Sequence, residues 1–239
     1  MSIVKHQYSD PTSLLQSAQN HFYSLILDSK TPTLILLSGG SNLSLLNSSL
    51  PKDNYSHLTV TTLDERFSID PNINNFHQLS FTPFFQSLIA QKANSISTIP
   101  QQNENLSDFG HRINQEITNW IIQNPNSQII ATIGIGSDSH IAGIIPGTFS
   151  NDEFDKKFLI PNTYITDINF GPLQKFPQRI TSTFPLLKLI NNAIIYIIGG
   201  DKLQALKNTF NLDLNYYQTP SRLLNELPGT INIYTDISI

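Results

Sequence analysis

Asp138-Ser139-His140 lies in a loop of glycines and short polar residues that directly follows the apolar run QIIATI. Because imidazole titrates near neutral pH, a histidine in such a loop could act as a general acid–base. A loop histidine that is hydrogen-bonded only for structure would give the same pattern. The segment lacks the Gly-x-Ser-x-Gly elbow of serine hydrolases, and a serine stands where a dinucleotide fingerprint needs its third glycine. Since no other metal ligands occur at recognisable spacing, the loop favours acid–base chemistry without a metal.

Ser38-Gly39-Gly40-Ser41 follows a second apolar run, LILL. Glycines permit positive φ angles and close backbone approach, and a helix that starts after Ser41 would present free N–H groups to an anion such as phosphate. The loop is not a Walker loop, because it lacks the Gly-Lys-Ser/Thr ending. An ordinary tight turn between a strand and a helix is the alternative interpretation of this segment.

Charged residues stand at the ends of further apolar runs. Asp64-Glu65-Arg66 follows LTVTTL, Arg179 opens RITST, and Lys202 closes GGDK. A planar guanidinium such as that of Arg66 could grip a phosphate, and Asp64 could accept hydrogen bonds from sugar hydroxyls. Each of these charges would also fit a solvated surface position. In a chain with only 14 Lys and Arg residues, however, cations beside strand-end loops favour a phosphorylated small ligand.

The elements that position these loops follow from hydrophobic periodicity. Strands are predicted for the apolar runs within residues 31–40, 57–67, 127–136, 191–200 and 230–236. Helices are predicted for residues 14–26, after Ser41, 74–89 with an interruption at Pro83, 106–121 with Ser107 or Asp108 near the start, and 202–210. Residues 146–182 have no clear pattern, and no element is predicted there.

Strands that alternate with helices predict an α/β fold of the Rossmann-like, three-layer kind: a mainly parallel sheet with helices on both faces. No linker or repeat divides the chain, so one domain over residues 1–239 is expected. In such sheets ligands bind beyond the carboxyl ends of the strands. Because the polar loops follow the strands, we expect them to converge on one site.

Composition excludes several classes of protein. The net charge is -4 and Lys and Arg do not cluster, so a general nucleic-acid binder is not expected. There are no cysteines, hence no disulfides or thiolate metal sites. The first residues contain no signal-peptide core, and no apolar run is long enough to span a bilayer. A cytoplasmic protein without membrane contact is expected, as a monomer or weak homodimer.

The motifs, in this order, resemble those of the 6-phosphogluconolactonase family, relatives of glucosamine-6-phosphate deaminase with the sugar-phosphate isomerase/CoA-transferase-like fold. The chain has SGGS at 38–41, DER at 64–66, NNF at 74–76, GIGSDSHIAGIIP at 134–146 and RITST at 179–183. It then has GGDK at 199–202, and its TPSRLL and INIYTD segments are similar to the family's ending. The matches extend over nearly the whole chain.

The resemblance implies hydrolysis of 6-phosphoglucono-δ-lactone to 6-phosphogluconate in the oxidative pentose phosphate route, without cofactor or metal. His140 is then the general base that activates water, with Asp138 orienting the loop or imidazole and Asp64 holding sugar hydroxyls. The implied substrate- and phosphate-binding residues are Ser38, Gly39, Gly40, Ser41, Arg66, Asn75, Arg179 and Lys202. Arg66 could either bind the phosphate or have a structural role.

The chain departs from the family pattern at several positions. Ser139 replaces a glycine, and its side chain would strain the backbone if φ is positive. Asn74 stands for a serine, and Gly143-Ile144-Ile145 differs from the lactonase's usual Ser-Leu-Phe. Deaminases carry a glutamate before the following proline, where this chain has Ile145, so lactonase is preferred. A deaminase-like enzyme and a non-catalytic sugar-phosphate sensor of the same fold are the alternatives.

Overall fold

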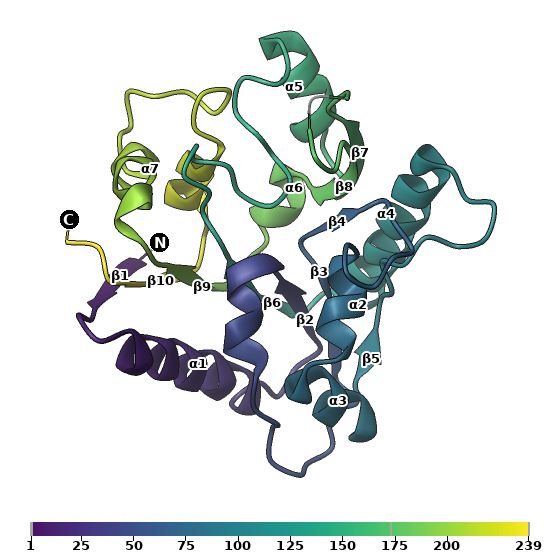
Figure 1. The fold of residues 1–239 in the computed structure, drawn as a ribbon. Coiled ribbons are helices and arrows are strands. Elements are labelled where there is room, and N and C mark those ends of the chain that lie inside the picture. Colours follow the sequence, from purple (N-terminus) through teal and green to yellow (C-terminus); the bar gives the residue numbers. More distant parts are fainter. Residues whose placement is uncertain (1, 173, 239) are drawn as a thin grey trace.

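Seven parallel strands form the central sheet, in the order β1-β10-β9-β6-β2-β3-β5 (Figure 1). The computed structural model describes residues 2–172 and 174–238. Every residue of β2 and β3 is buried, as expected of parallel strands covered on both faces. The predicted parallel sheet is confirmed. Its strands are β1 (Ser2–Gln7), β2 (Thr33–Leu37), β3 (Leu58–Thr62), β5 (Asn94–Ser95), β6 (Gln128–Ile133), β9 (Asn192–Ile197) and β10 (Thr230–Thr235).

Helices pack on both faces of this sheet, and the side chains of β2 alternate between the two cores. Ile35 and Leu37 contact one core, whose helices are α1 (Pro11–Leu27), the 3-10 helix η1 (Gly40–Leu46), α2 (Asn75–Ser80) and α3 (Pro83–Ala90). Leu34 and Leu36 contact the other, whose helices are α4 (Leu106–Gln123), α5 (Asn151–Phe158), α6 (Phe184–Leu187), α7 (Leu203–Thr209) and η3 (Pro220–Glu226). Within the described ranges, none of the helices is both long and apolar enough to cross a membrane.

Capping residues determine where several helices begin. The Thr82 hydroxyl accepts a hydrogen bond from the Phe85 N–H, and Pro83 fits the first turn because it has no N–H to leave unpaired. Residues 74–89 therefore form two helices, α2 and α3. At α4 the cap is Asn105, whose side chain accepts from the Asp108 N–H at 3.0 Å, and neither Ser107 nor Asp108 caps this helix.

A second, three-stranded antiparallel sheet was not predicted. It has the order β4-β8-β7, with β4 (Asp64–Arg66), β8 (Gln178–Ser182) and β7 (Ile165–Asn169). The single strand predicted within 57–67 is thus two strands, which separate at Leu63 and join different sheets. The segment 146–182, where no element was predicted, supplies α5, β7 and β8. The N-terminal β1 was also missed.

The direction in which successive strands are added to the large sheet reverses between β2 and β6. From β2 it continues to β3 and β5 on one side, whereas β6, β9 and β10 follow on the other side. Such a reversal opens a crevice at the carboxyl ends of the strands, where ligands of α/β proteins bind. The loops that leave β2 and β6 border this crevice.

Candidate active site

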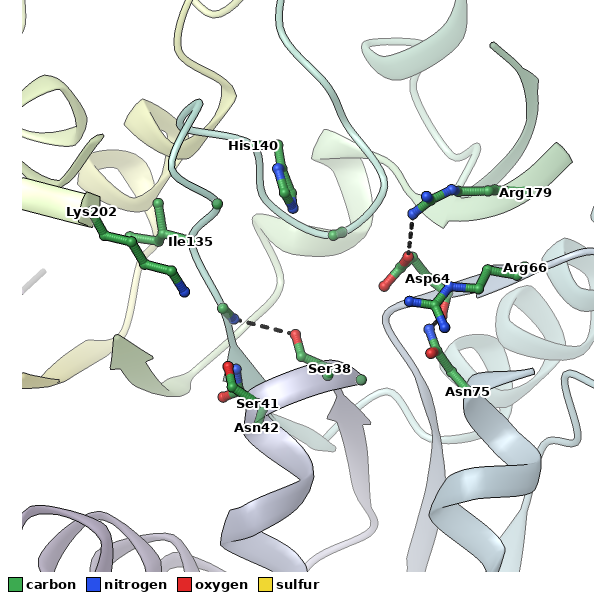
Figure 2. Close-up of a pocket in the computed structure, with 15 residues that line it drawn as sticks. Ser38, Ser41, Asn42, Asp64, Arg66, Asn75, Ile135, His140, Arg179 and Lys202 are labelled. Carbon is green, nitrogen blue, oxygen red and sulfur yellow. Dashed lines mark hydrogen bonds and ion pairs between the residues drawn. The ribbon is translucent and has the colours of Figure 1, made fainter. Parts of the chain in front are cut away.

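Loops and strands that are distant in sequence surround a cavity of about 340 Å³ at this crevice (Figure 2). All predicted site residues except Asp138 line it, and Asp138 reaches it through His140. The cavity is lined by Ser38, Gly39, Gly40 and Ser41 after β2, Asp64 and Arg66 in β4, Asn75 in α2, His140 after β6, Arg179 in β8, and Lys202 in the 3-10 helix η2 (Gly200–Lys202).

Sequence reasoning missed some lining residues: Asn42, Gly134, Ile135, Gly136 and Ala142. Asn42 is 2% exposed, and a Cβ at Gly134 would lie 2.9 Å from its Nδ2 atom. A side chain at position 134 would therefore displace the Asn42 amide from its place at the cavity. Asn42 could have been predicted from the sequence, because it is a polar residue that directly follows the SGGS loop.

His140 and Asp138 form a hydrogen-bonded pair. The His140 Nδ1 atom lies 2.6 Å from Asp138 Oδ1, and the His140 backbone N–H donates to the same oxygen at 3.1 Å. Burial acts to raise the pKa of Asp138, but the hydrogen bonds and charge of His140 outweigh it and hold that pKa below its ordinary value. Asp138 therefore stays ionised at neutral pH. It fixes the imidazole through Nδ1, which leaves Nε2 as the nitrogen for a ligand or water.

The backbone of this loop is shaped closely around the imidazole. A Cβ at Gly136 would lie 2.1 Å from His140 Nδ1, so only glycine fits there. Ser139 has a φ of 72°, which is the positive angle whose strain was anticipated, and its side chain is buried. Its carbonyl accepts from the Ser221 N–H at 3.1 Å. The surrounding contacts thus hold a non-glycine residue in the left-handed conformation, at a cost of about 1–2 kcal/mol.

The loop after β2 differs from its prediction in one respect. The element that follows is not an α-helix starting after Ser41 but the 3-10 helix η1, which starts at Gly40 with a φ of 62°. Ser38 accepts a hydrogen bond from the Gly134 N–H through its hydroxyl at 3.3 Å and so joins the loops after β2 and β6. A Cβ at Gly39 would lie 2.5 Å from Asn75 Oδ1, so glycine is required beside that amide.

Charged side chains enter the cavity from two sides. Lys202 lies on one side of His140, and Asp64, Arg66 and Arg179 lie on the other (Figure 2). Arg179 Nη1 is 3.7 Å from Asp64 Oδ2. Burial raises the pKa of Asp64, although Arg179, Arg66 and His140 favour its charged form, and burial lowers the pKa of Arg179. The cavity therefore combines positively charged groups with a carboxyl group that lies beside one of them.

Glu65, which stands between Asp64 and Arg66 in the sequence, is fully buried. The interpretation of this segment as a solvated charge cluster is therefore wrong for Glu65. Its carboxylate accepts the backbone N–H groups of Arg66, Asn75 and Phe76 and the hydroxyl of Thr98, at 2.6–2.9 Å. Burial nevertheless raises the pKa of Glu65 to about 8. Glu65 thus ties β4 to the start of α2 and places Asn75 at the cavity.

The profile of the glucosamine-6-phosphate isomerase/6-phosphogluconolactonase family matches residues 9–231. The chain belongs to this family.

Individual members of the family show how far the similarity extends. A 6-phosphogluconolactonase of Xylella fastidiosa is 25% identical over 95% of this chain and 93% of its own length. A glucosamine-6-phosphate deaminase of Borreliella burgdorferi is 24% identical over 92% of this chain and 84% of its own length. The crystal structure of a 6-phosphogluconolactonase from Shewanella baltica superposes with a TM-score of 0.76 at 17% identity, covering 98% of this chain and 97% of that one. The fold is therefore that of the 6-phosphogluconolactonases.

The burial of Glu65 gives a testable dependence of stability on pH. The folded chain retains a proton on Glu65 up to a pKa of about 8, whereas the unfolded chain releases it near the ordinary value of 4.5. This contribution to stability is thus complete below about pH 4.5 and is lost as the pH rises toward 8. We expect Glu65→Gln to lack this slope, which for one proton is at most about 1.4 kcal/mol per pH unit, because an amide does not titrate in this range.

Urea unfolding of both proteins between pH 5 and pH 8 provides the measurement. The difference in unfolding free energy between wild type and Glu65→Gln should shrink as the pH rises. A difference that is constant over this range would contradict the assignment.

Proposed function

We propose that this protein hydrolyses 6-phosphoglucono-δ-lactone to 6-phosphogluconate. The observation that carries the proposal is the His140–Asp138 pair in a cavity that also contains Lys202, Arg66 and Arg179. A hydrogen-bonded imidazole can activate water, and the cations attract a phosphorylated ligand. Relatives that match nearly the whole chain are named 6-phosphogluconolactonase, which agrees with this chemistry.

In the proposed reaction, His140 Nε2 removes a proton from a water molecule whose oxygen attacks the lactone carbonyl carbon. Asp138 keeps the imidazole oriented and stabilises the imidazolium that forms. The carbonyl oxygen carries the negative charge of the tetrahedral intermediate, and N–H groups of the surrounding loops stabilise it. The intermediate collapses when the bond between the carbonyl carbon and the ring oxygen breaks. His140 then returns its proton to the ring oxygen, which becomes a hydroxyl, and the carboxylic acid ionises.

The remaining polar groups bind the substrate in this proposal. Gly40, Ser41, Arg179 and Lys202 hold the phosphate, and Arg66 contributes positive charge beside Arg179. Asp64 binds sugar hydroxyls, because its carboxylate can accept hydrogen bonds from them. Phosphate binding far from the carbonyl fixes the position of the lactone, so the cations contribute to turnover as well as to affinity.

The second candidate is the deaminase reaction, because relatives named glucosamine-6-phosphate deaminase match this chain about as well as the lactonases do. The partner of His140 favours the lactonase. His140 is paired with Asp138 within its own loop, and position 145, where the resemblance implies a glutamate in deaminases, holds an isoleucine. Release of ammonia from glucosamine 6-phosphate would identify the deaminase. Binding of 6-phosphogluconate without either reaction would identify a sensor.

The first prediction concerns His140. We expect purified protein to accelerate acid release from freshly prepared lactone, and His140→Ala to lose about 100-fold or more of kcat, as removal of a general base does. Because such lactones also open spontaneously, the background rate must be subtracted. Binding of 6-phosphogluconate, measured by calorimetry, should persist in the variant. Equal rates for both proteins would refute His140 as the base.

The second prediction concerns Lys202. We expect Lys202→Met to lower kcat/KM for the lactone by roughly 10-fold, because a charge-assisted hydrogen bond to the phosphate is lost. Lys207→Met is the matched control, because Lys207 is an exposed lysine of α7 that does not line the cavity. Steady-state kinetics should leave the control close to wild type. If both variants behave alike, Lys202 does not bind the phosphate.

The third prediction concerns Ser139. Glycine at this position would relieve the strain of the positive φ but would also increase the entropy of the unfolded chain. Because these effects oppose each other, we expect Ser139→Gly to change the free energy of unfolding by less than about 1 kcal/mol. Lactonase activity should not fall, since the backbone already has the conformation that places His140. A loss of activity in the folded variant would show that the Ser139 side chain itself is needed.

A further inference from the structure

Arg66 and Arg179 are held side by side by the pairing of β4 with β8. In this antiparallel pair the Cα atoms of Arg66 and Arg179 are direct partners. Like charges directly opposite each other on paired strands repel and destabilise the pair. Both side chains nevertheless line the same cavity. The Asp64 carboxylate, 3.7 Å from Arg179 Nη1, offsets part of this repulsion, and other contacts also hold the two guanidinium groups in place.

One residue outside the cavity contacts both groups. The ring of Phe176, in the loop between β7 and β8, lies under the Arg66 guanidinium, with its centroid 5.0 Å from Cζ. The carbonyl oxygen of the same residue accepts a hydrogen bond from Arg179 Nε at 3.0 Å. A cation within about 6 Å of an aromatic centroid is attracted by the ring face. Phe176 thus stabilises one arginine through its side chain and the other through its backbone.

The other contacts of the two arginines differ from those that Phe176 makes. Arg66 Nη1 donates to the Ile73 carbonyl at 2.9 Å, but Arg66 Nε is buried without a hydrogen-bond partner among the described residues. The Phe176 ring therefore supports a guanidinium whose polar contacts are incomplete. Arg179 also lies over Phe170, with 5.9 Å between Cζ and the ring centroid. The loop that carries Phe176 is closed by a hydrogen bond from the Phe170 N–H to the Pro177 carbonyl at 2.9 Å.

We propose that Phe176 is a positioning residue that orients Arg66 and Arg179 as a paired anion clamp on one side of the cavity. Phe176 does not line the cavity, so it acts through the arginines and not on the ligand. The proposal rests on the proposed binding of a phosphorylated ligand in this cavity, but not on the hydrolysis of that ligand. Orienting the clamp in advance lowers the cost of ordering two long side chains when the ligand binds.

Substitutions at Phe176 test this role. We expect Phe176→Ala to raise the KM for the lactone roughly fivefold, the effect of losing one cation–π contact, and to change kcat much less. Phe176→Tyr keeps the ring, and its KM for the lactone should be close to that of the wild type. Phe176→Leu keeps apolar bulk without a ring and should resemble Phe176→Ala. Phe81→Ala is the matched control, because Phe81 is 68% exposed and is not part of the cavity.

A double-mutant cycle separates positioning from general packing. Phe176→Ala should have little further effect on KM in a protein that already carries Arg66→Met, because its target is then absent. Additive effects, or full recovery of the KM by Phe176→Leu, would overturn the proposal. The leucine variant also serves if the alanine variant fails to fold.

Calorimetry with inorganic phosphate and with 6-phosphogluconate tests the role of Phe176 independently of the proposed hydrolysis. If the wild type binds either probe more tightly than Phe176→Ala but does not hydrolyse the lactone, the clamp is supported and the lactonase is refuted. If the affinity for both probes is unchanged by Phe176→Ala, the clamp is refuted even where hydrolysis is observed.

Discussion

The in-register pairing of β2 with its two parallel neighbours is the constraint on which the site depends. Leu37, the last residue of β2, is paired with Thr62 of β3 on one side and with Thr132 of β6 on the other. All three strands therefore end at nearly the same level, and the loops that follow them start at the same edge of the sheet. A slip of one residue would exchange the side chains that β2 directs into the two cores, so the close packing of each core fixes this register.

Close contacts at glycines then determine how the loops fit together. Side chains at Gly39 and Gly136 would collide with Asn75 and His140, respectively. In each case the backbone of one segment occupies the space beside a side chain that lines the cavity and limits its movement. The imidazole is thus confined by the Gly136 backbone on one side and by its hydrogen bond to Asp138 on the other. Confinement of this kind favours catalysis because the side chain need not be ordered during the reaction.

The sequence predicted five of the seven strands of the large sheet and most cavity residues, because their signals are local. Apolar runs that end in glycine or charge mark strands whose loops line the cavity, and four such runs form β2, β3, β6 and β9. The small sheet could not be predicted in this way, since β4 has only three residues and depends on pairing with the distant β8. The burial of Glu65 was missed for the same reason. Its acceptor role depends on N–H groups of α2 and on Thr98, which the local pattern around Glu65 does not reveal.

The two sheets have to keep a fixed relative position, because the large sheet supports His140 while the small sheet supplies Arg66 and Arg179. Leu63, between β3 and β4, provides the connection. Its N–H donates to the Leu37 carbonyl of the large sheet at 2.9 Å, and its own carbonyl accepts from the N–H and the hydroxyl of Ser182 in β8. The Gly143 N–H, in the loop after β6, donates to the Thr181 hydroxyl of β8 at 2.8 Å. These bonds join β2, β8 and the loop of His140 directly. These hydrogen bonds therefore fix the relative position of the backbone segments that carry His140, Arg66 and Arg179.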